Sequence, residues 1–283
     1  MTKKILTKKQ QTILTLILTF RFINSKQIQQ FLEHKDHRRI NAWLKDITEK
    51  QYVIRDYTPI YGTLTKPAVY SLAALGRQYI RETFHPWDTT YLKRLRDDVK
   101  RSKAFRVKCQ LIADCCLIFF AGREKELIDT IQEILTEGVI LKEDVFQFFT
   151  PAFYSELEYD FPLLSQLKPD AYMYHKTETG IDHSCFYAID AYVPRLTLQY
   201  MLKNIFHILS NESWENDSIG SLQCYIICPS NMVIIYLRRL LKSFLERYYG
   251  STPILFHFAT RNQLYKWKKD KSKKIGWITV SSQ

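Results

Sequence analysis

Residues 36–57, with the sequence DHRRINAWLKDITEKQYVIRDY, carry the strongest structural signal in the chain. Asp36 is a good helix N-cap. Apolar residues follow it at the three- and four-residue steps of one helix face, namely Ile40, Leu44 and Ile47. This pattern predicts a helix over about 37–50. The β-branched and aromatic run over 52–57 then predicts a strand.

Working outward, the flanking sequence predicts two earlier helices and one later strand. Thr7-Lys8-Lys9-Gln10 has the form of a capping box before an apolar run, and Asn24-Ser25 can cap a second, shorter helix. Turn residues over 58–67 separate the first strand from a second one at 68–72. Three helices followed by a β-hairpin form the plan of a winged helix-turn-helix domain. In that plan the third helix enters the major groove and the hairpin tip contacts the DNA backbone.

The third helix and the hairpin tip carry side chains that suit DNA. Arg can read guanine, Asn can read adenine and Lys can meet a phosphate, while Thr also contacts phosphate oxygens. The candidate contacts are Arg38, Asn41 and Lys45 on the face opposite the apolar one, Arg39 on its flank, and Thr63, Thr65 and Lys66 at the tip. The alternative for the helix is an ordinary solvated face.

The charge of the chain is segregated along its length. Lys and Arg outnumber Asp and Glu by 23 to 9 over residues 1–108 and by 11 to 2 over 221–283, whereas acids outnumber bases by 18 to 7 in between. Basic segments of this kind favour a polyanionic partner, and we expect double-stranded DNA. The longest apolar runs are too short for a bilayer span and no secretion signal is evident, so we expect a cytoplasmic protein without membrane contact.

Residues 87–121 are expected to form one long helix whose first half is basic, with Lys93 and Lys100 as further candidate DNA contacts. Three roles stay open for this helix. It could follow a phosphate backbone, pair with a second copy in a homodimer, or connect two domains.

The remainder of the chain reads as an α/β domain. Strands are expected at 171–174, 184–193, 222–228, 254–258 and 277–280, with helices between them. Pro169-Asp170 opens one strand, Asp190 is expected inside the next, and Lys203 follows on a helix. This order resembles the restriction-endonuclease-like core of the PD-(D/E)XK nucleases, which implies two acids that hold Mg²⁺ or Mn²⁺ and a catalytic lysine.

The second nuclease motif is incomplete. If Asp190 is its acid, Tyr192 occupies the lysine position, and if Ala188 is the acid position, no acid remains. We therefore expect a nuclease-like domain without activity, and without a cofactor. The alternatives are a metal-dependent endonuclease that uses Asp170, Asp190 and Lys203, or a non-catalytic interaction scaffold.

The whole chain resembles the replication-relaxation family of plasmid and mobile-element proteins, which joins a winged helix to a nuclease-like domain. The matching phrases are Arg38-Arg39-Ile40, Gln51–Arg55, Tyr70–Gly76, Leu167–Tyr172 and Phe186–Asp190. Ala73 and Ala188 depart from the family pattern, which has Thr and Glu at these positions. The resemblance implies a role in replication, relaxation or their transcriptional control, together with the replication or relaxation proteins of the same element.

These observations predict a two-domain chain of the α+β and α/β classes. The winged helix-turn-helix domain is expected over 1–86, the basic linker helix over 87–121, and the PD-(D/E)XK-nuclease-like α/β domain over 122–283 with a basic C-terminal segment. The six cysteines show no metal-binding spacing and are expected to be reduced and buried.

Overall fold

The computed structural model describes residues 6–57, 66–84, 89–157, 161, 163–178, 180–209, 219–246, 254–269 and 276–281. The chain divides into two compact units, Met1–Ile140 and Leu141–Gln283. None of the described helices is long and apolar enough to cross a membrane.

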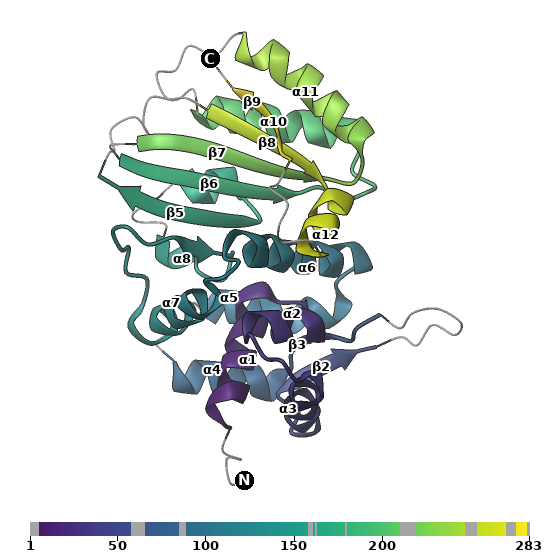
Figure 1. The fold of residues 1–283 in the computed structure, drawn as a ribbon, viewed down its shortest axis with the longest axis vertical. Coiled ribbons are helices and arrows are strands. Elements are labelled where there is room, and N and C mark those ends of the chain that lie inside the picture. Colours follow the sequence, from purple (N-terminus) through teal and green to yellow (C-terminus); the bar gives the residue numbers. More distant parts are fainter. Residues whose placement is uncertain are drawn as a thin grey trace. The chain divides into compact units, whose positions relative to one another are not determined.

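The first unit opens with the three helices and two strands that the sequence predicts, together with one more short strand and a fourth helix (Figure 1). In chain order they are α1 (Lys8–Phe20), β1 (Ile23–Asn24), α2 (Ser25–Phe31), α3 (His37–Glu49), β2 (Val53–Asp56), β3 (Val69–Leu72) and α4 (Ala74–Thr83). The predicted caps are confirmed, because Thr7, Asn24 and Asp36 each accept hydrogen bonds from backbone N–H groups at the start of their helices. The three strands form an antiparallel sheet in the order β1-β3-β2. The two-residue strand β1 was not predicted.

The predicted apolar face of α3 is buried, and α4 packs closely on the strands. Ile40, Leu44 and Ile47 are at most 1% exposed. The backbone O of Tyr52, just before β2, accepts a hydrogen bond from Ala73 N–H at 3.0 Å. A Cβ placed on Gly76 would lie 2.1 Å from that same oxygen. Glycine at this position therefore lets α4 approach the strand.

The single helix expected over 87–121 is broken in the structure. It consists of α5 (Thr89–Arg94), the 3-10 helix η1 (Leu95–Lys100) and α6 (Lys103–Phe119). Asp98 turns inward and pairs with Arg21, and Ser102 then caps α6 by accepting from Phe105 N–H at 3.2 Å. Val99 is 58% exposed. The continuous helix was wrong, because the backbone is extended at Arg101 and Ser102, between η1 and α6.

The first unit extends past residue 121. Helix α7 (Glu124–Glu137) contacts α1 and α2, and Gln132 Nε2 donates to Thr12 Oγ1 at 2.8 Å. Helix α6 is joined to α2 by Gln27, which donates to Gln110 O and to Asp114 Oδ1, both at 2.7 Å. The division between compact units therefore falls after Ile140, whereas the sequence placed a linker over 87–121 and a second domain from 122.

The second unit is built on a six-stranded mixed sheet in the order β4-β5-β6-β7-β8-β9. The strands are β4 (Gln147–Phe149), β5 (Ala171–Thr177), β6 (Gly180–Ala188), β7 (Ile219–Cys228), β8 (Ile254–Thr260) and β9 (Ile278–Ser281). Strands β4, β5 and β6 pair antiparallel, β6, β7 and β8 pair parallel, and β9 pairs antiparallel with β8. The short strand β4 was not predicted.

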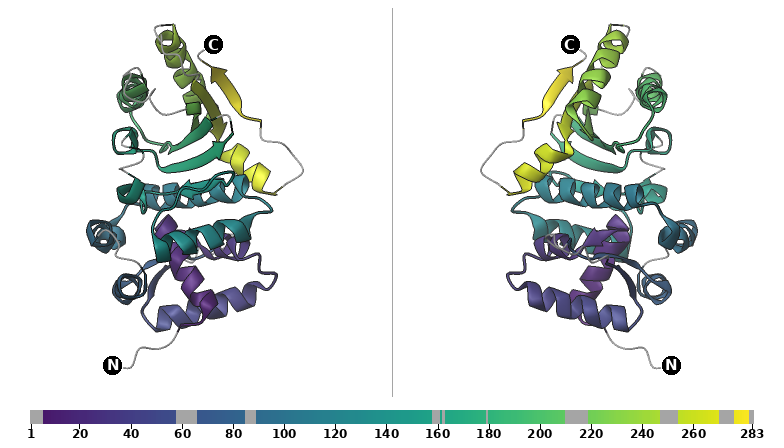
Figure 2. Two further views of the ribbon diagram at one scale, coloured as in Figure 1. Left: turned by 90° about the vertical axis from the view of Figure 1, so that its left-hand side faces the viewer. Right: turned by 90° about the vertical axis from the view of Figure 1, so that its right-hand side faces the viewer.

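Helices cover this sheet. Short helices α8 (Tyr154–Leu157) and α9 (Leu163–Leu167) precede β5. Helices α10 (Arg195–Leu209) and α11 (Asn231–Leu245) connect the parallel strands and pack on each other. Helix α12 (Arg261–Lys269) follows β8 and lies on the other side of the sheet from α10 (Figure 2). All six cysteines are free, and five of them are buried.

Candidate nucleic-acid interface

A groove of about 890 Å³ lies on the first unit between helices α2 and α3 and the β2–β3 pair. The residues that line it are Ser25, Lys26, Gln29, His37, Ile40, Asn41, Lys45, Thr48, Glu49, Arg55, Tyr57, Lys66, Pro67, Ala68 and Tyr70. Helix α3 contacts α2 and β2, and residues of α2, α3, β2 and β3 share the lining of the groove (Figure 1).

Helix α3 forms one wall of the groove with a single face. His37, Asn41, Lys45 and Thr48 follow at four- and three-residue steps, and the first three are exposed. Because the adjacent face of the helix is buried in the core, these side chains are held toward the groove. Helix-borne donors and acceptors of this kind are those that reach base edges in a major groove.

The strands form the facing wall. Arg55 on β2 is paired directly with Tyr70 on β3. The guanidinium of Arg55 hydrogen-bonds the Tyr70 hydroxyl and lies 4.8 Å from the centre of the Tyr57 ring. Burial raises the pKa of Tyr70, and the neighbouring Arg55 partly opposes that rise. The arrangement fixes one cation on the wall between two aromatic rings.

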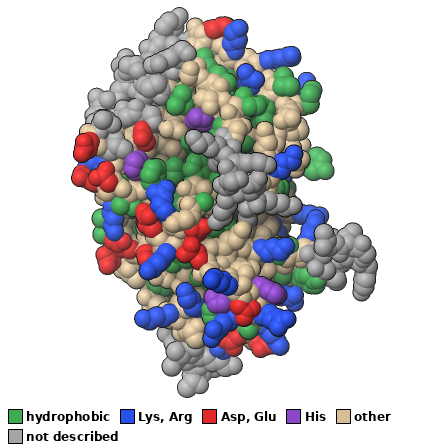
Figure 3. All heavy atoms as spheres, in the orientation of Figure 1, with side chains coloured by type: hydrophobic (Ala, Val, Ile, Leu, Met, Phe, Trp, Pro, Cys, Tyr) green, Lys and Arg blue, Asp and Glu red, His purple; other side chains and the backbone are tan. Residues whose placement is uncertain are grey.

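The charge of the groove is positive. Four cations line it, Lys26, Lys45, Arg55 and Lys66. Glu49 is the one acid among its described residues, and its carboxylate lies 3.7 Å from the Lys45 ammonium, both groups being well exposed. Figure 3, which has the orientation of Figure 1, shows Lys and Arg side chains gathered on the lower part of the surface, where α3 lies, with His, Asp and Glu among them. Such a surface attracts a phosphate backbone.

The DNA contacts predicted on α3 and at the hairpin tip divide into three groups. Asn41, Lys45 and Lys66 line the groove. Arg38 and Arg39 are exposed on α3 but do not line it, and the Arg39 guanidinium lies 6.0 Å from the Trp43 ring centre. Thr63 and Thr65 lie outside the described residues.

Sequence reasoning missed two cations of the groove, Lys26 and Arg55. Lys26 lies in the first turn of α2, for which the sequence predicted a helix but no DNA contact. Arg55 lies in a run for which the sequence predicted a strand but no DNA contact. Strand alternation places Arg55 on the same face as the buried Val53, so the sequence pattern predicts a buried position for Arg55. On β2, Val53 is buried and the residues from Ile54 to Asp56 are all exposed, so buried and exposed positions do not alternate.

The two basic residues predicted on the linker lie elsewhere. Lys93, on α5, lines a separate pocket together with residues of α4. Lys100 is exposed at the end of η1. Neither residue lines the groove of α2, α3 and the strands.

The candidate catalytic residues of the second unit are placed as follows. Asp170 precedes β5, and its Oδ2 accepts a hydrogen bond from Ala188 N–H at 2.9 Å. The Asp170 N–H in turn donates to Phe186 O at 2.8 Å. The carboxylate thus fastens the start of β5 to the end of β6.

Asp190 does not lie inside a strand, so that expectation was wrong. Strand β6 ends at Ala188, and Asp190 stands in the turn that follows, where its Oδ1 accepts from Tyr192 N–H at 3.4 Å. Asp favours this position because its side chain bonds the backbone two residues on. Lys203 is exposed on α10.

Asp170 and Asp190 are the candidate ligands for Mg²⁺ or Mn²⁺. Over the part of the chain that the structure describes, no group of three or more His, Cys, Asp or Glu side chains is placed to hold a metal ion. Both carboxylates also accept backbone N–H bonds. Because Mg²⁺ is commonly held by one or two carboxylates together with water, a metal site at Asp170 and Asp190 stays a prediction.

Comparisons with known proteins add little to this geometry. No family model matches the chain, and neither does any curated protein. Among solved structures, the chain is similar to the restriction endonuclease FokI bound to DNA, with a TM-score of 0.31 and 11% identity. The match covers 94% of this chain and 45% of that one, so the chain spans less than half of the FokI chain. The proposals therefore rest on the residues of this chain.

Proposed function

We propose that the first unit is a winged helix-turn-helix domain that binds double-stranded DNA through the groove formed by α2, α3 and the β2–β3 pair. The observation that carries the proposal is the convergence of Lys26, Lys45, Arg55 and Lys66 on one groove beside the exposed face of α3. In this function α3 enters the major groove with Asn41 facing base edges, and the lysines meet phosphates on either side.

The order of elements supports the same proposal. A three-helix unit followed by an antiparallel pair, with a third short strand at β1, is the arrangement in which a recognition helix is presented beside a hairpin. The aromatic side chain of Tyr57 lies at the end of β2 next to the hairpin, where it can contact sugar or base surfaces. Arg38 and Arg39 extend the positive surface along α3 toward its N-terminus.

The test measures affinity for a random-sequence duplex of about 20 bp, long enough for two turns of DNA, as a function of salt. We expect Lys45→Ala and Lys66→Ala each to weaken binding and to reduce the slope of log affinity against log salt by about one. Lys125→Ala, which removes an exposed cation of α7, is the matched control and should behave as the wild type. Equal slopes in all four proteins would refute the proposed interface.

For the second unit we propose a nuclease-like fold without catalytic activity. An antiparallel β5–β6 pair, a crossover helix α10 and a parallel β7 follow one another in the order of the PD-(D/E)XK core. The incomplete second motif and the turn position of Asp190 support the loss of activity. The link to plasmid or mobile-element replication, and to partner proteins of that element, stays a prediction from the resemblance.

A further inference from the structure

A second pocket lies on the first unit between α4 and the segment formed by α5 and η1. It has a volume of about 490 Å³ and is lined by Ala74, Arg77, Gln78, Arg81, Leu92, Lys93 and Arg96. None of these residues lines the groove proposed for DNA. The volume lies in the range of small-molecule sites.

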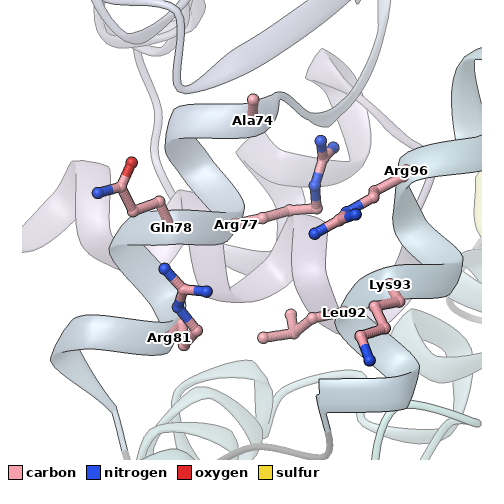
Figure 4. Close-up of a pocket in the computed structure, with 7 residues that line it drawn as sticks. All are labelled: Ala74, Arg77, Gln78, Arg81, Leu92, Lys93 and Arg96. Carbon is pink, nitrogen blue, oxygen red and sulfur yellow. The ribbon is translucent and has the colours of Figure 1, made fainter.

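Four of the seven lining side chains are cations, contributed by both walls. Arg77 and Arg81 come from α4, Lys93 from α5 and Arg96 from η1. In Figure 4 the side chain of Arg96 extends toward Arg77, and Leu92 extends toward Arg81. The charge of Arg96 lowers the pKa of Arg77, as expected for repulsion between the two cations, and an anion bound beside them would relieve that repulsion.

Two acids near the pocket in sequence, Glu82 and Asp98, bond to other side chains. The lining described by the structure contains no Asp or Glu. Asp98 is buried and pairs with Arg21, and Glu82 accepts a hydrogen bond from Gln78 Nε2 at 2.9 Å. Burial lowers the pKa of Arg77, the charge of Arg96 lowers it further, and Asp98 acts in the opposite direction.

The position of Arg77 is fixed before any ligand arrives. Its Nη1 donates to Leu72 O at 3.0 Å, so the guanidinium is anchored at the end of β3 and its remaining donors are left for a partner. Arg81, Lys93 and Arg96 are exposed at the rim. A fixed inner cation and adjustable outer ones form the kind of site that recognises phosphate oxygens by charge-assisted hydrogen bonds.

We propose that this pocket binds a small ligand that carries two or more linked phosphate groups, such as a nucleoside di- or triphosphate. One phosphate monoester carries roughly −1.5 to −2 charge at neutral pH, so a single group would leave about half of the four cations unbalanced. Leu92 and Ala74 provide apolar surface that a sugar or base can cover. A duplex backbone offers the same phosphate chemistry, and the test separates the two sources.

The test is calorimetric titration of the full-length protein at low salt with ATP, pyrophosphate and orthophosphate. We expect ATP and pyrophosphate to bind at least about tenfold more tightly than orthophosphate, because charge-assisted hydrogen bonds each add appreciable affinity. The double variant Arg81→Gln/Arg96→Gln should weaken ATP binding at least tenfold while leaving the anchored Arg77 in place. Arg94→Gln removes an exposed cation of the same segment outside the pocket and should leave ATP binding unchanged.

Two further arms identify the source of the phosphate. Lys45→Ala/Lys66→Ala should bind ATP as the wild type does, because its substitutions lie in the other groove. Absence of ATP and pyrophosphate binding, or equal ATP binding by the wild type and Arg81→Gln/Arg96→Gln, would overturn the proposal. So would a result in which that double variant weakens only duplex DNA binding, since the pocket would then be a backbone contact.

Discussion

At the scale of single residues, Gly76 shows how one missing Cβ sets the packing of a helix. A Cβ at this position would lie 2.1 Å from the Tyr52 backbone oxygen, which is too close for any carbon. That oxygen is already held by Ala73 N–H, so it cannot move away freely. The glycine at position 76 is thus explained by the contact of α4 with Tyr52, the residue before β2.

We predict that Gly76→Ala lowers the free energy of unfolding by about 1–3 kcal/mol, the usual cost of forcing an extra carbon into a packed site. Urea denaturation of the full-length protein measures it. Gly276→Ala is the matched control, because a Cβ at Gly276 would meet open space. A Gly76→Ala protein as stable as the Gly276→Ala protein would contradict the packing argument.

His183 is a buried histidine whose proton affinity is reduced. It is 7% exposed, and its Nδ1 lies 2.6 Å from the Tyr172 hydroxyl. Burial lowers the pKa of His183 to about 4 from an ordinary value of 6.5. The folded protein therefore keeps this imidazole neutral at pH values where the unfolded chain protonates it.

The consequence is a loss of stability as the pH falls from about 6.5 to about 4. Above 6.5 the group is neutral in both states and makes no pH-dependent contribution, and below that value proton uptake favours the unfolded chain. The full effect is on the order of 3 kcal/mol. Denaturant unfolding at a series of pH values should show this slope in the wild type and a flatter one in His183→Gln. His207→Gln, on the exposed face of α10, is the control and should keep the wild-type slope. A wild-type slope in His183→Gln as well would refute the assignment.

At the scale of elements, α2 is held in place by a buried amide. The side chain of Gln27 is fully buried, accepts from Asn24 N–H at 3.0 Å, and donates to Gln110 O and Asp114 Oδ1 on α6. Because Asp114 is itself buried, the loss of this donor is costly. One residue therefore completes the cap of α2 and joins it to α6.

We predict that Gln27→Leu destabilises the first unit by about 1–3 kcal/mol, since an apolar side chain cannot donate to Asp114. Gln30→Leu, on the exposed side of the same helix, should change stability by less than about 0.5 kcal/mol. Thermal or chemical unfolding followed by circular dichroism distinguishes them. If both variants unfold alike, α2 is not anchored through this amide.

Local sequence predicts some of these elements and misses others. Caps and apolar periodicity predicted α1, α2 and α3, because those signals act within a few residues. The break between η1 and α6 carries one local signal, the Ser102 cap, whereas the pair of Asp98 with Arg21 joins residues 77 positions apart and lies outside any local pattern. Strand β4 was missed because three residues are too few for a period to be recognised, and Asp190 was misplaced because the apolar run before it continues beyond the last residue of β6.

At the scale of the whole molecule, the charge pattern of the sequence predicted a polyanionic partner but not where it would bind. The groove joins Lys26, Lys45, Arg55 and Lys66, which lie on α2, α3, β2 and the residues before β3. Only the fold brings these four together, so sequence analysis found the α3 and hairpin members alone. Likewise, the pocket between α4 and η1 joins cations that the sequence showed merely as part of a basic segment.

The most direct test of the account is hydrogen–deuterium exchange of the full-length protein with and without a random duplex of about 20 bp, at low salt where backbone contacts support binding. The account predicts slower exchange on DNA binding in residues 25–29 and 37–49 and in the segments around Arg55 and Lys66, with no comparable change in α10 and α11. Protection concentrated in the second unit, with α3 unaffected, would contradict it.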